Sequence, residues 1–465
     1  MGSELSINIR EMKQSMKENY PSKFDKIESQ TQFRHLPTER REMLKKIACE
    51  HLFTQQELKN AVDIDIDLTM WGTQGFTERW HEYKTQSRQT GKQLKKDIFN
   101  KINTAINQLI SKPVHYQENP SAPGKFKETK VTVKKSASTE KIYGMCPVAS
   151  AKTICCNLRT IDAVKNCGFG CSYCGIQTMY SNQEVTFDER FEEKLNEIML
   201  DKNRRYHIGT GQSSDSLMWG NKQGILEAML NFARKWPNAT IEFKTKSKNI
   251  KHLLQMDVPD NIVCSWSLNP QIVIDNEEHL TASFDERLAA ARAVADKGIK
   301  VSFHFHPMIH FDGWQEAYAD IFKCVQTNFK TPEVLFISFG SLTFPKPVIK
   351  KIRRYGIQSR ILQMPMQPNP EGKMTYPDDI KKELFRFGFQ SFNLWHDKVF
   401  FYLCMEEKKF WLDTFGFAYD TNEGFENALN DAIWLKKSVI LNQESTATNV
   451  SPRYSQPYMK NGISS

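Results

Sequence analysis

Cys167-Gly-Phe-Gly-Cys171-Ser-Tyr-Cys174 is the most informative segment of this sequence. Its cysteines follow a Cys-x-x-x-Cys-x-x-Cys spacing, which places three thiolates on one short loop. Three thiolates can hold three irons of a four-iron, four-sulfur (4Fe-4S) cluster and leave the fourth iron without a protein ligand. An iron left open in this way can bind a small molecule and pass it one electron. The segment therefore predicts a redox-active iron–sulfur centre.

A structural zinc site is the alternative explanation of these cysteines. Zinc in structural sites takes four ligands, usually as two paired spacings, and no matching second pair follows Cys174. The chain has ten cysteines, and in a cytosolic protein such a number favours metal binding over disulfides. The spacing thus favours the iron–sulfur cluster over zinc.

The composition is that of a globular protein with an excess of basic residues. The chain has 465 residues, enough for about two or three domains. Hydrophobic residues make up 40% and charged residues 25%, and the net charge of +9 suits a polyanionic partner such as nucleic acid. Met1–Arg10 is followed by polar sequence rather than the apolar core of a secretory signal, and no apolar run reaches the ~18 residues of a membrane span. We therefore expect a cytoplasmic protein with reduced cysteines and no membrane partner.

Residues 1–112 are predicted to form a helical region. Pro37 suits the first position of a helix, and Thr54-Gln-Gln-Glu57 has the form of a capping box. A further helix is expected over residues 94–110, where isoleucines recur at i, i+4 spacing. This region is expected to be a helical appendage of a catalytic domain or a binding module.

Two segments interrupt or end the regular pattern. Residues 113–150 are expected to be a linker or a basic hairpin, because prolines break the segment and Lys125–Lys135 alternates basic and apolar residues. The lysines of this stretch are more simply explained as a solvated face. Residues 401–442 are expected to close the domain, and residues 443–465, rich in Ser and Asn, to form a disordered tail.

From residue 151 to about 400 the sequence alternates strand and helix patterns. This alternation predicts an α/β fold with a parallel sheet and outer helices. The expected strands are residues 206–211, 240–244, 263–268, 300–306 and 333–339, with a first strand at Ala151–Asn157 just before the cysteine motif. Such units suit an open or partial barrel whose active site lies at the C-terminal ends of its strands.

Residues from about 150 to 330 resemble spore photoproduct lyase, a radical S-adenosylmethionine enzyme that repairs a thymine dimer in spore DNA. The resemblance is carried by the cysteine motif and by four later segments in the same order: Ser213-Ser-Asp215, Thr245-Lys246, Ser267-Leu-Asn269 and Ser283-Phe-Asp-Glu-Arg-Leu-Ala-Ala-Ala-Arg292. The resemblance implies a partial (β/α)6 barrel with an N-terminal helical region in front of it.

The resemblance also implies roles for individual residues. Cys167, Cys171 and Cys174 would ligate the 4Fe-4S cluster. S-adenosylmethionine would be bound by Gly209, Gly211, Ser214, Lys246 and Ser267. A lysine at a strand end suits the methionine carboxylate, and glycine permits close backbone approach. Lys246 is otherwise explained as one of several surface lysines in Lys244-Thr-Lys-Ser-Lys248.

Two positions depart from the family's pattern. The lyase has a cysteine that returns a hydrogen atom to the repaired thymine, and this chain has Gln212 there. The lyase has a tyrosine directly after the third cluster cysteine, and this chain has Gly175. Tyr173, inside the motif, remains a catalytic candidate. The lyase's Arg-Tyr hairpin, which wedges the lesion, has no clear counterpart, and residues 363–377 are the candidate segment for its place.

Other chemistry-bearing residues follow later strands. His304, His306 and His310 are candidates for a metal site or for polar groups that line the barrel mouth. Cys404 follows an apolar, aromatic strand and is explained either as a core residue or as a thiol that donates hydrogen in place of the missing cysteine.

We therefore expect a lyase-like radical enzyme that reductively cleaves S-adenosylmethionine to a 5′-deoxyadenosyl radical. DNA or another nucleic acid is the expected partner, with repair or a modified nucleobase as the target, and a flavodoxin or ferredoxin is the expected electron donor. The alternative is a nucleic-acid-binding or zinc-stabilised protein without radical chemistry, in which the helical N-terminus and the basic segment bind the ligand.

Overall fold

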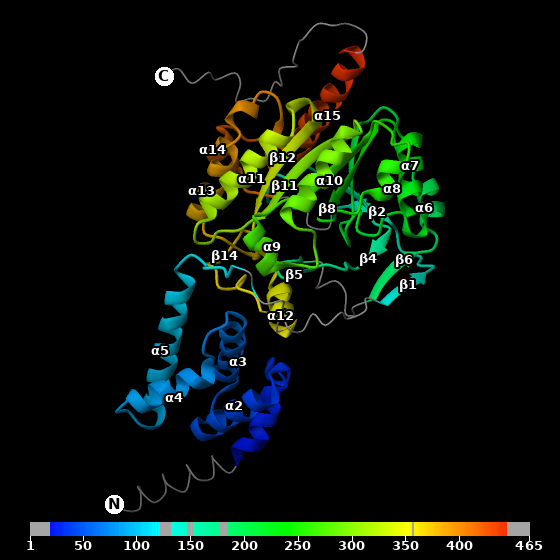
Figure 1. The fold of residues 1–465 in the computed structure, drawn as a ribbon. Coiled ribbons are helices and arrows are strands. Elements are labelled where there is room, and N and C mark those ends of the chain that lie inside the picture. Colours follow the sequence, from blue (N-terminus) through cyan, green and yellow to red (C-terminus); the bar gives the residue numbers. More distant parts are fainter. Residues whose placement is uncertain are drawn as a thin grey trace, which may run out of the picture. The chain divides into compact units, whose positions relative to one another are not determined.

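The computed structural model describes residues 19–118, 120, 132–146, 150, 152–175, 184–355 and 358–443. The chain forms two compact units, drawn in Figure 1. A helical unit comprises Met1–Val114 and Ile349–Pro365, and an α/β unit comprises His115–Val348 and Met366–Ser465. The predicted helical start and the later strand–helix alternation are both present.

The helical unit has short amphipathic helices around an aromatic core. Residues 19–28 are helical, and η1 (Phe33–His35), α2 (Thr38–His51), α3 (Gln55–Met70), α4 (Phe76–Gln86) and α5 (Gly91–Ile110) follow. The capping box is confirmed, since Glu57 N donates to Thr54 Oγ1 and Thr54 N donates to the Glu57 carboxylate. Pro37 lies one position earlier than predicted, at the N-cap of α2. Phe53 and Trp80 pack edge to face with ring centres 5.3 Å apart.

A later segment of the chain returns to the helical unit. Helix α12 (Lys346–Tyr355) carries Arg353, whose guanidinium lies 2.7 Å from Asp67 and 3.1 Å from Asp63 on α3. The backbone N–H of Ser359 donates to the carbonyl of Met70 at 3.2 Å. Residues far apart in sequence are therefore held together by partly buried charge pairs that no local pattern reveals.

The α/β unit is built on one curled sheet with the order β16-β12-β11-β9-β8-β7-β3-β2. From β3 to β16 every neighbouring pair is parallel, and β2 pairs with β3 in antiparallel fashion at the edge. The strands are β2 (Tyr143–Met145), β3 (Arg159–Ile161), β7 (Tyr206–Thr210), β8 (Ala239–Thr245), β9 (Ile262–Ser267), β11 (Lys300–Met308), β12 (Val334–Ser341) and β16 (Phe400–Leu403).

Helices follow the strands and cover the sheet, as Figure 1 shows for α10 and α11 beside β11 and β12. Helix α7 contacts β8, α10 contacts β9 and β11, and α13 and α15 contact β12. The helices are α6 (Phe191–Glu197), α7 (Ile225–Lys235), α8 (Lys251–Gln255), α9 (Gln271–Glu277), α10 (Phe284–Asp296), α11 (Trp314–Asn328), α13 (Asp378–Gln390), α14 (Lys408–Phe415) and α15 (Asn422–Gln443), with one-turn helices η3 (Lys222–Gly224), η4 (Thr331–Glu333) and η5 (Asn393–Trp395). The α/β fold with a partial barrel is confirmed.

The predicted first strand is wrong. In the expected range Ala151–Asn157, Ile154 forms only an isolated bridge with Glu406, and the first parallel strand is β3, which begins at Arg159. Asn157 has a φ of +49°, a left-handed conformation that ends extended structure. The remaining predicted strands coincide with β7, β8, β9, β11 and β12 to within a few residues.

Three small sheets flank the main one. Their strands are β1 (Thr132–Ser136), β6 (Glu184–Asp188) and β4 (Val164–Lys165); β5 (Gly170–Cys171) and β10 (Glu278–His279); and β13 (Thr343–Phe344), β15 (Met374–Thr375) and β14 (Gln367–Pro368). Part of the predicted basic hairpin, residues 125–131, lies outside the described residues. The described part is not a hairpin, because β1 pairs in parallel with the distant β6. The predicted tail beyond Gln443 also lies outside the described residues.

Among the described residues, no helix is long and apolar enough to cross a membrane.

Candidate active site

The cysteine motif lies on a small sheet that faces the ends of the barrel strands. Cys171 ends β5, which pairs with β10 so that Cys171 is opposite Glu278. The N–H of Ser172 donates to the carbonyl of Glu277 at 2.8 Å, and the N–H of Cys174 donates to the carbonyl of Cys171 at 3.1 Å. The motif is therefore a tight turn whose middle is held by backbone pairing.

The three thiols are neighbours in a largely buried setting. Burial raises the pKa of Cys167 and of Cys171. The nearby Glu278 carboxylate raises the pKa of Cys171 further, the cation of Lys246 lowers it, and the other two thiols raise it again. Within the part of the chain that the structure describes, no three His, Cys, Asp or Glu side chains converge as the ligands of a single metal ion would. Three cysteines on one loop match in number the three corners of a cluster that the protein would hold, whereas structural zinc requires four ligands.

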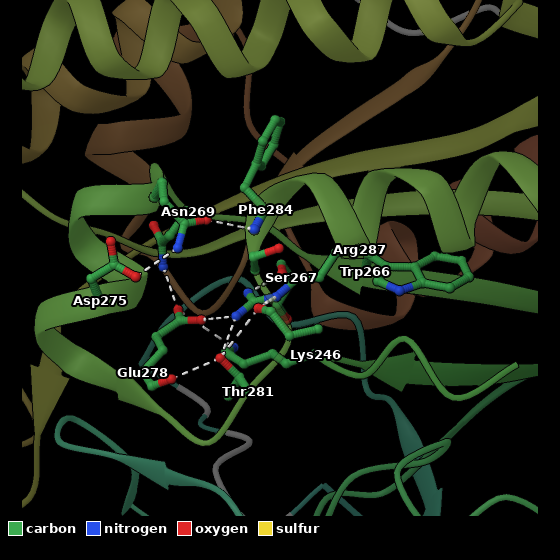
Figure 2. Close-up of polar contacts among 12 residues, drawn as sticks. Lys246, Trp266, Ser267, Asn269, Asp275, Glu278, Thr281, Phe284 and Arg287 are labelled. Atoms are coloured by element: carbon green, nitrogen blue, oxygen red, sulfur yellow. Dashed lines mark hydrogen bonds and ion pairs between the residues drawn. The ribbon is translucent and has the colours of Figure 1, made fainter. Parts of the chain in front are cut away.

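A buried carboxylate connects this motif to the barrel strands. We call Tyr173, Lys246, Asn269, Glu278 and Arg287 the Glu278 group, part of which Figure 2 shows. Arg287 Nη2 lies 2.6 Å from Glu278 Oε2, and both side chains are fully buried. Asn269 Nδ2 donates to Glu278 Oε1 at 2.8 Å, and the Tyr173 hydroxyl donates to the same oxygen. Lys246 Nζ lies 4.0 Å from that oxygen and 5.8 Å from the centre of the Tyr173 ring.

The charge of Glu278 is stabilised by its partners rather than by water. Burial alone would raise the pKa of Glu278, but Arg287, Lys246 and the hydrogen bonds from Tyr173 and Asn269 outweigh burial and hold the pKa at about 2. Arg287 is fixed in turn, because its other nitrogens donate to the carbonyls of Ala282 and Ser267 at 2.8 and 2.9 Å. The group is therefore a permanently charged, rigid support under the cysteine motif.

The predicted S-adenosylmethionine contacts lie at neighbouring strand ends. Lys246 directly follows β8, Ser267 ends β9, and Ser214 lies in the loop after β7. Asp215, which the sequence analysis did not single out as a site residue, joins two of these loops. Its carboxylate accepts from Thr245 Oγ1 at 2.7 Å and from the backbone N–H of Lys246 at 2.8 Å. Asp215 thereby fixes the backbone from which Lys246 extends.

Gly209, within β7, and Gly211, just after it, are glycines for different structural reasons. Gly211 has a φ of +71°, and a Cβ there would lie 2.6 Å from the backbone nitrogen of Ser216. Any side chain would therefore be strained and would collide with the turn. Gly209 lies within β7, where a Cβ would approach the Leu158 side chain to 2.9 Å. Both positions keep the strand end open.

A pocket of about 210 Å³ lies at the ends of β11, β12 and β16. Its lining includes Tyr173, His306, Gly340 and Cys404. The structure thus brings the two predicted catalytic residues, Tyr173 and Cys404, to one cavity. Burial raises the pKa of Cys404 to about 12, so this side chain is a thiol rather than a thiolate at neutral pH.

The residue at the missing-cysteine position lies elsewhere. Gln212 lines a different cavity, together with Asp162, Ser213 and residues of the segment 136–142. Gly175, at the missing-tyrosine position, is exposed. Cys404 therefore does not occupy the place of the absent cysteine but approaches the pocket from β16.

The three candidate histidines do not form one site. His304 and His306 lie 5.2 Å apart, ring centre to ring centre, inside the barrel. His310 packs on Trp314 at 5.8 Å instead. The hypothesis that these side chains jointly hold a metal is not supported by this arrangement, whereas His306 lines the pocket as the second explanation predicted.

The segment 363–377 does contain a hairpin. Its strands β14 and β15 pair in antiparallel fashion, and the turn between them carries Asn369, Glu371 and Lys373, which line the pocket. The turn reads Asn369-Pro-Glu-Gly-Lys373 and has no Arg-Tyr pair. The hairpin is thus in a position to contact a ligand, but with different side chains from those of the lyase.

Comparison with known proteins agrees with this geometry. Residues 156–364 match the family model described as spore photoproduct lyase. Spore photoproduct lyase from a Geobacillus species is 26% identical over 201 residues, which cover 42% of this chain and 59% of that protein. The Clostridium acetobutylicum protein of the same name is 24% identical over 200 residues, with 41% and 59% covered.

A solved structure of spore photoproduct lyase complexed with dinucleoside spore photoproduct shares the fold, with a TM-score of 0.50 and 20% identity over 62% of this chain and 88% of the other. The fold is thus the half barrel of radical S-adenosylmethionine proteins. Within that class the chain is similar to spore photoproduct lyase, and the resemblance predicted from the sequence is confirmed. The chain spans about three fifths of the length of the curated relatives that it matches.

Proposed function

We propose that this protein is a radical S-adenosylmethionine enzyme that acts on DNA or a modified nucleobase. The observation that carries the proposal is the meeting of the cysteine motif and the strand-end lysine at Glu278. Tyr173, inside the motif, donates to Glu278, and Lys246 Nζ lies 4.0 Å from the same oxygen. A centre held by the motif and a ligand held by Lys246 would therefore be neighbours.

Cys167, Cys171 and Cys174 would hold a 4Fe-4S cluster by their thiolates. When bound, the cluster would supply one electron to S-adenosylmethionine, whose cleavage gives methionine and a 5′-deoxyadenosyl radical. Burial raises the pKa of Cys167 and of Cys171, so the bound metal centre would have to stabilise thiolates that burial disfavours.

Lys246 would bind the carboxylate of S-adenosylmethionine. Its side chain is largely buried and its backbone is fixed by Asp215, so the cation is positioned in advance. Ser214 and Ser267 would supply polar contacts from the two adjacent strand ends, and Gly209 and Gly211 would admit the ligand close to the backbone.

The pocket that Tyr173 and Cys404 share would hold the substrate. The relatives are named for spore photoproduct, a nucleic-acid lesion, and the pocket's polar lining suits a nucleobase. Cys404 would donate hydrogen to the substrate radical, since it keeps its S–H at neutral pH. Tyr173 would contact the same radical, and a flavodoxin or ferredoxin would supply the electron.

Anaerobic reconstitution tests the proposal. Because one 4Fe-4S cluster contains four irons, each chain should bind about four irons. On reduction it should form 5′-deoxyadenosine from S-adenosylmethionine. Replacing Cys167, Cys171 and Cys174 together by Ala should abolish both. Cys324→Ala is the matched control, because Cys324 lies on α11, away from the motif. Cleavage that survives in the triple variant would refute the proposal.

The substrate and the hydrogen donor need a second assay. Dinucleoside spore photoproduct and thymine-containing oligonucleotides, each deuterated at candidate positions, serve as probes, and label in 5′-deoxyadenosine identifies the hydrogen that is removed. Cys404→Ala should retain iron and 5′-deoxyadenosine formation but give less product. An unchanged product yield would exclude Cys404 as the donor.

A further inference from the structure

A continuous set of hydrogen bonds crosses the inside of the barrel from strand to strand. We call His207, Glu242, His304, Ser338 and His306 the Glu242 network. Glu242 on β8 accepts from His207 Nε2 at 2.8 Å and from His304 Nε2 at 2.6 Å. Ser338 Oγ on β12 lies 2.6 Å from His304 Nδ1 and 3.0 Å from His306 Nε2. The network therefore joins a fully buried carboxylate to the pocket-lining ring of His306.

The protonation states of this network follow from counting donors. Burial would raise the pKa of Glu242, but the imidazoles of His304 and His207 outweigh it and hold the pKa well below its usual range, so Glu242 is ionised. An ionised carboxylate only accepts hydrogen bonds, so His304 must carry its proton on Nε2. Burial lowers the pKa of His304 to about 4, so the ring is neutral and its Nδ1 accepts.

The protonation state of His304 fixes the direction of the two hydrogen bonds that Ser338 makes with His304 and His306. Because His304 Nδ1 accepts, the Ser338 hydroxyl must donate to it. The Ser338 oxygen then accepts from His306 Nε2–H. A neutral His306 with its proton on Nε2 has a lone pair on Nδ1. The ring that lines the pocket is therefore left with an open proton-accepting nitrogen.

The fold keeps His306 in this place. Gly340 lies directly behind the ring, and a Cβ there would approach the His306 ring atoms Cδ2, Cγ and Nε2 to 3.0–3.2 Å. The absence of a side chain at Gly340 thus gives the ring the room to reach Ser338. Asn369, Glu371 and Lys373 of the β14–β15 turn line the same pocket and make its lining partly polar.

We propose that His306 exchanges a proton with a ligand in this pocket and that the Glu242 network relays it. The ligand would present an acidic N–H or O–H group, such as the imide N–H of a pyrimidine. The inference rests on the proposed function only for the identity of that ligand.

The transfer balances without any further reactant. The ligand's proton moves to His306 Nδ1, the Nε2 proton of His306 moves to Ser338 Oγ, and the Ser338 proton moves to His304 Nδ1. The ligand is left as an anion and His304 as an imidazolium beside ionised Glu242. Three protons each move one step, and the net result is the transfer of one proton from the ligand to His304. No electron moves, and the new positive charge lies on the ring whose Nε2 is 2.6 Å from a Glu242 oxygen.

Other charged groups around the rings set how readily they take a proton. Burial lowers the pKa of His306 well below its usual value, and the charges of Lys244, His304 and Lys246 lower it further, while the carbonyl of Phe339 acts in the opposite sense. Both rings are thus neutral in the resting state and are weak bases, so they would hold the ligand's proton only transiently before it returns or moves on.

The test begins with the metal-free chain, so its result does not depend on radical chemistry. Protein labelled with ¹⁵N-histidine is examined by NMR at pH 7, where ring-nitrogen shifts distinguish the two tautomers, and resonances are assigned with single His→Gln variants. We expect the proton on Nε2 in both His304 and His306. A His306 ring that carries its proton on Nδ1 would overturn the relay.

Ser338→Ala provides the second measurement. It removes the acceptor of His306 Nε2–H and the donor to His304 Nδ1, so the tautomer of His306 should change toward Nδ1–H. His310→Gln is the matched control, because His310 is half-buried but packs on Trp314, outside the network. An unchanged His306 tautomer in Ser338→Ala would contradict the inference. Because Ser338→Ala removes only a hydroxyl group, this test remains available if a His→Gln variant fails to fold.

Turnover then tests the role of the relay. His304→Gln preserves both hydrogen bonds, since the amide donates to Glu242 and accepts from Ser338, but it cannot store a proton. With dinucleoside spore photoproduct as the probe, the ratio of product to 5′-deoxyadenosine should fall at least about tenfold. An unchanged ratio would refute the relay. A wild-type chain that forms no 5′-deoxyadenosine would refute the proposed function instead, and the tautomer measurement would still decide this inference.

Discussion

Two buried glutamates in the same half barrel are stabilised in opposite ways. Glu278 is paired with Arg287 at 2.6 Å, a cation that does not lose its charge in proteins. Glu242 is paired with His207 and His304 at 2.8 and 2.6 Å, imidazoles that can be neutral or charged. Both carboxylates have pKa values below the usual range because their partners outweigh burial.

The difference in partners gives the two glutamates different roles, one structural and one in proton transfer. A carboxylate neutralised by arginine fixes positions and cannot move a proton, and in this protein it lies under the cysteine motif. A carboxylate shared by two imidazoles leaves room for one more proton, and its network ends at the pocket. The role of a buried carboxylate in this barrel therefore depends on whether its partner is an arginine or a histidine.

The largest loss in the free energy of unfolding should come from removing the guanidinium of Arg287. Arg287→Gln leaves Glu278 buried without its counter-ion, and breaking a buried pair in this way costs about 3–5 kcal/mol. Denaturant unfolding measures the loss. Arg292→Gln on the same helix is the control, because its pair with Glu333 is partly exposed and should cost about 1 kcal/mol or less. A similar cost for both variants would contradict the distinct role of Glu278.

Glu242→Gln should cost less. The amide can still accept from one ring while it donates to the other, so the substitution leaves no carboxylate charge buried without a partner. The loss should be about that of hydrogen bonds to a charged group, 1.5–3 kcal/mol. The same unfolding experiment measures it, and a cost as large as that of Arg287→Gln would show that the imidazoles carry a fixed charge.

The two glutamate groups should also lose stability in different pH ranges. The folded pKa of His304 is about 4, and an unfolded imidazole titrates near about 6.5. Since the unfolded chain binds the extra proton between these values, the free energy of unfolding should fall as the pH drops from about 6.5 toward about 4. Glu278, with a folded pKa of about 2, should lose its contribution only as the pH falls from about 4.3 toward that value.

Urea unfolding across this pH range checks the expectation. His304→Gln should flatten the upper part of the profile and leave the lower part unchanged. The rings of His306 and His310, whose pKa values are also lowered by burial, contribute to the upper part as well. A profile that His304→Gln leaves unaltered would show that the imidazole titrates alike in the folded and unfolded chains.

The smallest effect on stability is expected at Gly340. Gly340→Ala would press a Cβ against the His306 ring, but the ring borders a pocket and can move, so the cost should be about 1 kcal/mol, at the low end for overpacking. The tautomer of His306 should nevertheless change, because the displaced ring moves away from Ser338 and loses its hydrogen bond to the Ser338 hydroxyl. Gly144→Ala on β2, where a Cβ would meet nothing within 4 Å, is the control for both readouts.

The local sequence was sufficient to predict those elements that are stabilised by interactions between neighbouring residues. The capping box at Thr54 and Glu57, the strands from β7 to β12 and the cysteine turn were all predicted, because capping, hydrophobic runs and ligand spacing involve neighbouring residues. The strand before the motif was predicted too early, since the left-handed Asn157 has no distinct signal in its surroundings. The Arg353 contact with α3 was missed, because Asp67 is 286 residues away.

The sequence by itself determined the spacing of the cysteine motif, the half-barrel class and the resemblance to spore photoproduct lyase. Spacing fixes how many thiolates share a loop, and strand–helix alternation fixes the class of sheet. Only the tertiary structure decided that Tyr173, His306 and Cys404 share one pocket while Gln212 lines another. It also decided that Glu278 on β10 faces Arg287 of helix α10, because tertiary packing brings this helix against the small sheet. Glu242 faces two histidines because parallel pairing sets the register of β7, β8, β9 and β11.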